Sequence, residues 1–357
     1  MTSPRIALCL TGGGLTGAMY QIAALAALED ALDGFCASAC DVYVGVGAGA
    51  PVAAALAGGA SVQRLYRTFL DPADDYFPLQ RGHLLKMDLD EWRRTITSAW
   101  SAIRAGTSSL SSRAPSPGDL LEQLDRFNDS LPAGVFTLDA FEHLLEEAFF
   151  RRDVPNHFRS MPRTLRVPAY DLDSGERVVF GAPGADDVPV ARACAASMAL
   201  PPFYSPVRIA DRHYLSGSVG AVAHVDVALA EGVDAVIVVN PLVTIRTSGE
   251  VPTGHGPRES LRDKGLIWIH EQASRIAATR RFEERIGLLG AAAERVLVIA
   301  PEPAETSLFL HHPGSVRSRR GLLETVYRST RERLPATLAG APVASRAAGL
   351  SPREAAR

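Results

Sequence analysis

The chain lacks the sequence features of metal-binding, disulfide-rich, secreted and membrane-spanning proteins. Its 357 residues include only 4 cysteines, which have neither the spacing of a metal site nor the density of a disulfide scaffold. No uncharged apolar run approaches the ~20 residues that span a bilayer, and the first residues lack the long apolar core and cleavage site of a signal peptide. We therefore expect a cytoplasmic protein with no metal site, no cofactor and no transmembrane segment.

The chain also lacks an excess of charge of either sign. It has 37 lysines and arginines against 40 acidic residues, a formal net charge of −3. This balance gives no general attraction to nucleic acid or to an anionic bilayer. We expect no nucleic-acid partner, and any peripheral contact with a membrane has to be local.

Glycine-rich turns, in contrast, occur twice in the same setting. Residues 5–10 form a short apolar run that ends at the glycines of residues 12–14, and residues 17–32 then have the side chains of a buried helix. Residues 42–57 repeat this order of strand, turn and helix around Gly47. Such alternation predicts a parallel sheet with crossover helices, whose ligand sites lie at the carboxyl ends of the strands. Both turns are therefore expected to face one crevice.

The pattern changes at residue 71, where helices separated by polar breakers begin and continue to residue 150. Within them, residues 89–103 carry a single apolar face, which either packs in the core or forms a lid over an apolar pocket. A Ser/Pro-rich loop follows at residues 106–119.

The sheet is predicted to resume after this insertion. Residues 164–180 read as a β-hairpin, and residues 234–240 have the continuous apolar run of a strand covered on both faces. Long arginine-rich helices are expected within residues 260–334, where the arginines form either a solvated face or a patch for phospholipid head groups. Residues 335–357 have the composition of a disordered tail.

The order of these motifs resembles the bacterial patatin-like phospholipase family. The resemblance covers roughly residues 5–334 and is carried by GGGLTG, GVGAGA, AYDLDSGE, ACAASMALPPFYSPV and YLSGSVGAVAHVDVALAEGVDAVIVVNPL. The family implies a single α/β domain over residues 5–334, a three-layer α/β/α sandwich with a mostly parallel central sheet, a helical insertion at 71–150 and C-terminal helices at 260–334. It also implies hydrolysis of lipid acyl esters by a Ser-Asp dyad without a histidine base.

The family's glycines can be placed residue by residue on this chain. The resemblance assigns the nucleophile elbow to Gly45 and Gly49, on either side of residue 47. It assigns the oxyanion loop to four further glycines, Gly12, Gly13, Gly14 and Gly17.

The two dyad positions, however, hold other residues. The serine position is Gly47, and the aspartate position is Ser216, followed by the expected Gly217. His224 falls where the bacterial subgroup also has histidine. Two basic residues expected after the Asp-Gly pair are replaced by Gly220 and Ala221.

These losses predict a protein without hydrolytic function, because acyl transfer needs a nucleophilic atom and a base. We expect it to bind an acyl lipid or fatty-acyl ligand, or a protein partner, either a second copy of itself or an active patatin-like paralogue. One alternative is weak or relocated acyl hydrolysis, in which Ser216 and His224 form a new Ser-His pair. Another is dinucleotide binding, since Gly12, Gly14 and Gly17 satisfy the G-x-G-x-x-G pattern. That alternative lacks an acidic residue at the end of the second strand.

Overall fold

The computed structural model describes residues 4–71, 74–87, 131–247, 249–310 and 316–353, together with residues 92, 93, 95–97, 100, 125, 128 and 129. The predicted loop at 106–119 and most of the predicted helix at 89–103 lie outside the described residues. Within that helix, Ile96 and Trp100 are 52% and 61% exposed. These two side chains therefore do not pack in the core.

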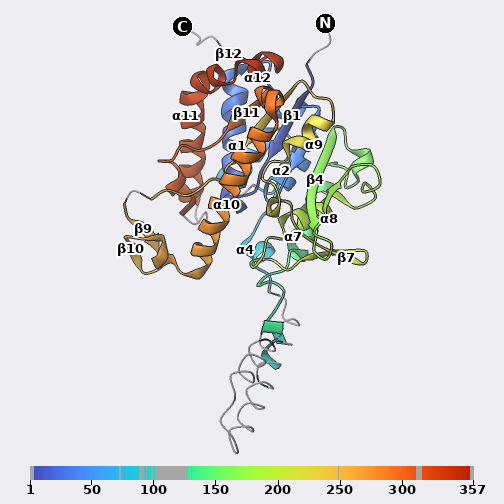
Figure 1. Ribbon diagram of the computed structural model, residues 1–357, viewed down its shortest axis with the longest axis vertical. Helices are drawn as coiled ribbons and strands as arrows, with labels where there is room; N and C mark the ends of the chain where they lie inside the picture. The colour runs from blue at the N-terminus through green and yellow to red at the C-terminus, as the bar shows by residue number, and fades with distance from the viewer. Residues whose placement is uncertain are drawn as a thin grey trace, which may run out of the picture.

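A sheet of eight strands lies at the centre of the molecule (Figure 1). Its order is β11-β8-β1-β3-β4-β7-β6, and β5 pairs with β4 outside this path. The first five strands in that order are parallel, whereas β4 pairs antiparallel with β5 and β7, and β7 with β6. The strands are β1 (Ile6–Leu10), β3 (Val42–Gly45), β4 (Thr164–Asp171), β5 (Arg177–Phe180), β6 (Val207–Ile209), β7 (Arg212–Ser216), β8 (Ala235–Val239) and β11 (Val296–Ile299). The mostly parallel sheet and the hairpin at 164–180 are thus confirmed.

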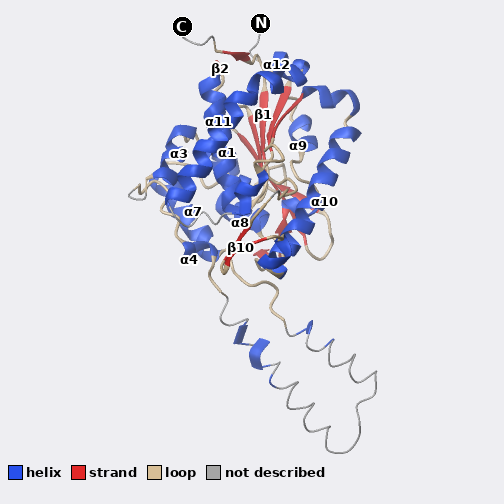
Figure 2. Ribbon diagram, turned by 90° about the vertical axis from the view of Figure 1, so that its left-hand side faces the viewer, coloured by secondary structure: helices blue, strands red, loops and turns tan. Residues whose placement is uncertain are grey.

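Helices cover both faces of this sheet, as Figure 2 shows. Side chains of alternate strand residues enter two cores, so that Leu8 faces one and Cys9 the other. The first core is covered by α1 (Gly14–Ala31), α2 (Gly49–Ala57), α3 (Val62–Leu70), α7 (Asp139–Arg151), α8 (Val190–Met198) and α11 (Val316–Gly340). The second is covered by α9 (Val225–Ala230) and α10 (Leu266–Leu288). The fold is therefore the three-layer α/β/α sandwich that the resemblance implied.

Short elements complete the described chain. Among the described residues there are two further short helices, α4 (Arg81–Leu84) and α12 (Pro342–Ala347). The 3₁₀ turns are η1 (Ala37–Ala39), η2 (Phe158–Ser160), η3 (Gly217–Val219), η4 (Leu261–Lys264), η5 (Gly290–Arg295) and η6 (Thr306–Leu310). Two small antiparallel pairs join β9 (Val251–Thr253) to β10 (Gly256–Arg258) and β2 (Leu32–Asp33) to β12 (Ser351–Pro352). In the described part of the chain, no helix combines the length and the hydropathy needed to cross a bilayer.

The C-terminal part differs from the sequence expectation in two places. The sequence predicts one helix over residues 261–289, but Gly265, with φ +86°, a conformation that glycine adopts easily, separates η4 from α10 within it. The expected disorder does not hold for residues 335–353, because α11 continues to Gly340 and α12 and β12 follow it. Burial of Leu338 and Ala344 against the first core holds this segment in place. Residues 354–357 lie outside the described residues.

Candidate functional site

The two glycine turns lie side by side because β1 and β3 are adjacent parallel strands. In the first turn, Gly13 and Gly14 have φ values of +109° and +64°, which favour glycine. A Cβ on Gly17 would lie 2.7 Å from the Gly12 carbonyl oxygen, so α1 packs directly on the loop. The backbone N–H groups of Gly13 and Gly14 have no hydrogen-bond partner among the described residues. Such amides at a helix N-terminus are suited to hold a negatively charged or carbonyl oxygen.

The second turn has the backbone of a nucleophile elbow. Gly47 has φ +56°, and its N–H donates to Ser197 Oγ at 3.1 Å. A Cβ on Gly45 would lie 2.6 Å from Ala50 Cα, and one on Gly49 would overlap the Leu10 carbonyl oxygen. A Cβ on Gly47 would lie 3.1 Å from Gly12 Cα, so any side chain there would point at the first turn. The second turn therefore lies beside the first, and Gly47 carries no reactive side-chain atom.

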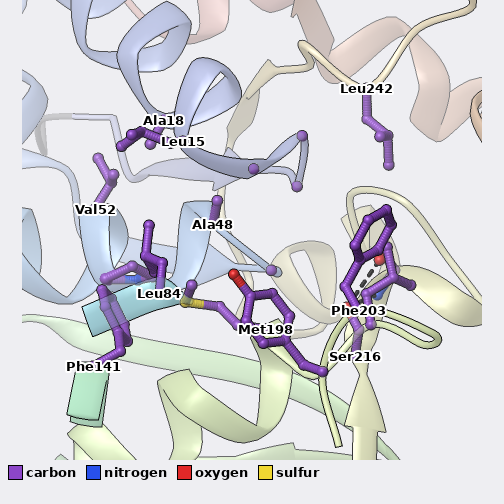
Figure 3. Close-up of a pocket in the computed structure, with 18 of the residues that line it drawn as sticks. Leu15, Ala18, Ala48, Val52, Leu84, Phe141, Met198, Phe203, Ser216 and Leu242 are labelled. Carbon is purple, nitrogen blue, oxygen red and sulfur yellow. Dashed lines mark hydrogen bonds between the residues drawn. The ribbon is translucent and has the colours of Figure 1, made fainter. Parts of the chain in front are cut away.

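The second dyad position, Ser216, ends β7. Its backbone N–H donates to the Ala199 carbonyl at 2.9 Å, two residues beyond Ser197, so the C-terminal end of α8 contacts both dyad positions. The Ser216 side chain is buried, and its Oγ lies 2.9 Å from Ser218 Oγ (Figure 3). A Cβ on Gly217 would overlap the Pro168 carbonyl oxygen, which explains why glycine follows. Ser216 thus forms a local turn contact and supplies no carboxylate.

His224 stands at the start of α9, where it caps the helix with φ +45°. Its Nδ1 lies 3.2 Å from Arg177 Nη1, which can only donate, and its Nε2 lies 3.0 Å from the Gly217 carbonyl oxygen. Nε2 therefore carries the proton. Burial lowers the pKa of His224 to about 4, so the ring is neutral near pH 7. Both ring nitrogens have these other partners, so no hydrogen bond joins His224 to Ser216 in the described structure, and relocated hydrolysis stays a prediction.

The departure from the family at residue 220 has a steric cause. A Cβ on Gly220 would overlap the Tyr170 hydroxyl and ring. The Tyr170 side chain therefore occupies the space that a basic residue at 220 would need.

A large apolar cavity of about 650 Å³ adjoins the two glycine turns. Its polar end is lined by Gly12, Gly13, Gly14, Gly47, Ser216 and Ser218. Its remaining wall is mostly apolar and includes Leu15, Ala18, Ile22, Val52, Phe69, Leu84, Phe141, Leu145, Phe149, Met198 and Phe203. In Figure 3, Leu84, Phe141 and Val52 lie on one side of the view, and Leu242 and Ser216 lie on the other. The labelled side chains on the first side are all apolar, whereas Ser216 lies with the apolar Leu242 and Phe203 on the other.

A family model of patatin-like phospholipases matches residues 8–229, more than half of the chain. The chain belongs to this family. Patatin-like phospholipases hydrolyse acyl esters of lipids. A search of curated proteins found no match to this patatin-like chain.

Solved structures also resemble this patatin-like chain. VipD from Legionella pneumophila is 14% identical, with a TM-score of 0.38, over 91% of this chain and 67% of VipD. The type III effector ExoU is 15% identical, with a TM-score of 0.41, over 94% of this chain and 53% of ExoU. ExoU in complex with SpcU, from Pseudomonas aeruginosa, is 17% identical with a TM-score of 0.34. The chain thus spans about half the length of the ExoU structures.

The sequence did not point to one wall of the patatin-like cavity. This wall is formed by α10, which follows the glycine turns and β8 by many residues in the chain. Its lining residues include His270, Glu271, Ser274, Ala278 and Arg281. Their spacing of three and four residues places them on one face of the helix, and this periodicity was the available signal. The approach of α10 to the glycine turns is a tertiary contact that no local pattern contains.

Proposed function

We propose that this patatin-like protein binds an acyl-chain lipid in the cavity and does not hydrolyse it. Acyl transfer needs a nucleophilic atom, a base for its proton and donors for the oxyanion. Gly47 supplies no nucleophile, Ser216 supplies no carboxylate, and only the loop amides remain. Enzymes that lose members of such a set retain only ~10³ to 10⁴-fold acceleration over water. That residual rate does not support a role in turnover.

The observation that carries the proposal is the apolar cavity of about 650 Å³, which is lined by Gly47 and by the first glycine turn. Its volume is in the range of pockets that enclose small ligands. Its aliphatic and aromatic walls favour a hydrocarbon chain, for which burial contributes about 0.8 kcal/mol per methylene. The loop amides can donate hydrogen bonds to the carbonyl or carboxylate oxygen at the end of that chain. A deep apolar cavity favours a lipid over the protein partner that the sequence left open.

Lipid binding can be tested on the purified full chain. Native mass spectrometry should detect a co-purified acyl lipid, and a fluorescent fatty acid should bind the emptied protein. Ala18→Phe should reduce this binding, because Ala18 lines the cavity. The matched control is Ala26→Phe, since Ala26 is equally buried on α1 but lies outside the cavity. Equal binding by two folded variants would contradict the proposed site.

Loss of hydrolysis can be tested with a p-nitrophenyl ester. We expect no turnover by the wild type above background, and turnover by the double variant Gly47→Ser with Ser216→Asp, which supplies both missing groups. Gly47→Ser alone separates the two contributions. Wild-type turnover within ~10²-fold of the double variant would contradict the proposal, since breaking such a unit typically costs on the order of 10⁶.

A further inference from the structure

One charged side chain that lines the cavity, Arg281, forms no ion pair with a described residue. The described lining includes three side chains that are ionised near neutral pH, Arg152, Glu271 and Arg281. Arg152 pairs with Asp75 at 3.4 Å, and Glu271 pairs with Arg275 at 2.7 Å. Arg281 forms no hydrogen bond or ion pair with any described residue, and its Nε is buried without a partner.

Arg281 lies toward the polar end of the cavity. It follows Ala278 by one helical turn, and Ala278 packs with Leu242 in a small core cluster. Leu242 would lie 3.8 Å from a Cβ on Gly12, in the oxyanion loop. Figure 3 shows Leu242 on the side of the cavity opposite Phe141. Arg281 therefore lies one turn along α10 from a residue whose neighbour Leu242 is beside the first glycine turn.

The electrostatic surroundings agree with this placement. Burial raises the pKa of Tyr170, and the positive charges of Arg177, Arg285 and Arg281 oppose that rise. The Tyr170 hydroxyl lies against Gly220, close after the Ser216–Ser218 turn. Asp226 adds a negative charge at the same place, so the four charges together show that Arg281 acts on the side of the cavity near Tyr170.

A partly buried guanidinium without a counter-ion is unfavourable, because it loses hydration and gains no opposite charge. Its planar set of donors matches the oxygens of a carboxylate or a phosphate. An acyl lipid with an anionic group would satisfy both ends of the cavity at once, with its chain among the apolar residues and its charge at Arg281.

We propose that Arg281 binds the anionic group of the acyl ligand, so that the cavity selects anionic acyl lipids over neutral ones. The inference rests on the proposed function and names the chemical class of its ligand. The anionic group is either the carboxylate of a free fatty acid or the phosphate of a lysophospholipid.

The test compares three ligands with the same chain: palmitate, palmitoyl lysophosphatidate and neutral methyl palmitate. Each is titrated into the full-length protein in competition with a fluorescent fatty acid. The wild type should bind at least one anionic ligand about tenfold more tightly than methyl palmitate, which corresponds to about 1.4 kcal/mol. A preference for palmitate assigns a carboxylate, and a preference for lysophosphatidate assigns a phosphate.

Variants of α10 decide whether Arg281 is responsible. Arg281→Gln should remove the preference, and Arg281→Lys should retain part of it because the charge remains. Arg280→Gln is the matched control, since Arg280 is 77% exposed, lies 4.0 Å from Glu283 and does not line the cavity. It should leave the preference unchanged.

The outcomes separate the two proposals. If all three ligands bind equally well to the wild type, or if Arg281→Gln keeps the preference, the inference about Arg281 is overturned while lipid binding stands. If none of the ligands binds, the proposed function fails, and the inference fails with it.

Discussion

Replacing Gly47 by serine should destabilise the protein, even though it restores the residue type that the family resemblance implies at this position. Gly47 has φ +56°, and a left-handed backbone costs a residue with a Cβ about 1 to 2 kcal/mol. The new Cβ would also lie 3.1 Å from Gly12 Cα, so the oxyanion loop has to move by a few tenths of an ångström. Restricting the unfolded chain offsets this by about 0.4 to 1 kcal/mol. The net loss in the free energy of unfolding should therefore be about 1 to 2 kcal/mol.

Two other glycines separate these contributions in urea denaturation at pH 7. Gly34 has φ +71° with no atom within 4 Å of a Cβ, so Gly34→Ser measures the backbone cost alone. Gly321 lies in α11 with the same open space and no positive φ, so Gly321→Ser measures the gain from the unfolded chain. Stability should fall in the order Gly321→Ser, Gly34→Ser, Gly47→Ser. If Gly47→Ser were as stable as Gly321→Ser, the strain argument would be refuted.

Two further predictions concern residues around the aspartate position. His224 has its pKa lowered by burial from 6.5 to about 4, so its contribution to stability is complete above pH 6.5 and is lost as the pH falls through 4. The loss in the free energy of unfolding should reach about 3 kcal/mol. In denaturation measurements from pH 7 to 4, this free energy should depend less on pH in His224→Asn, a substitution chosen because asparagine tolerates the left-handed backbone. An equal pH dependence in the wild type and the variant would count against a buried neutral ring. Gly220→Ala should cost about 1 to 3 kcal/mol because its Cβ overlaps Tyr170. The double variant Gly220→Ala with Tyr170→Ala should lose less free energy of unfolding than the sum of the losses in the two single variants. Strict additivity in this double-mutant cycle would rule out the steric account.

Local patterns predicted the part of the fold whose signals are local. The strand and glycine turn before α1 recur before α2, and the apolar run of β8 is buried along its whole length. Composition was misleading after residue 334, because an Ala-rich segment reads as a tail unless its contacts are known. Leu338 and Ala344 are buried there by partners distant in sequence. The positions of Gly47 and Ser216 followed from motif order, whereas Arg281 needed the tertiary placement of α10.

The glycines that resemble a hydrolase motif do not by themselves indicate retained chemistry, since packing requires them. A Cβ on Gly45, Gly49 or Gly217 would press on neighbouring backbone atoms whether or not a nucleophile is present. The cavity is different, because no steric rule keeps it open. Folds gain stability when side chains fill apolar space, and Tyr170 fills the space beside Gly220 in this way. Next to Gly47 the described side chains leave a cavity of about 650 Å³, and this space is what supports the proposal of a bound acyl ligand.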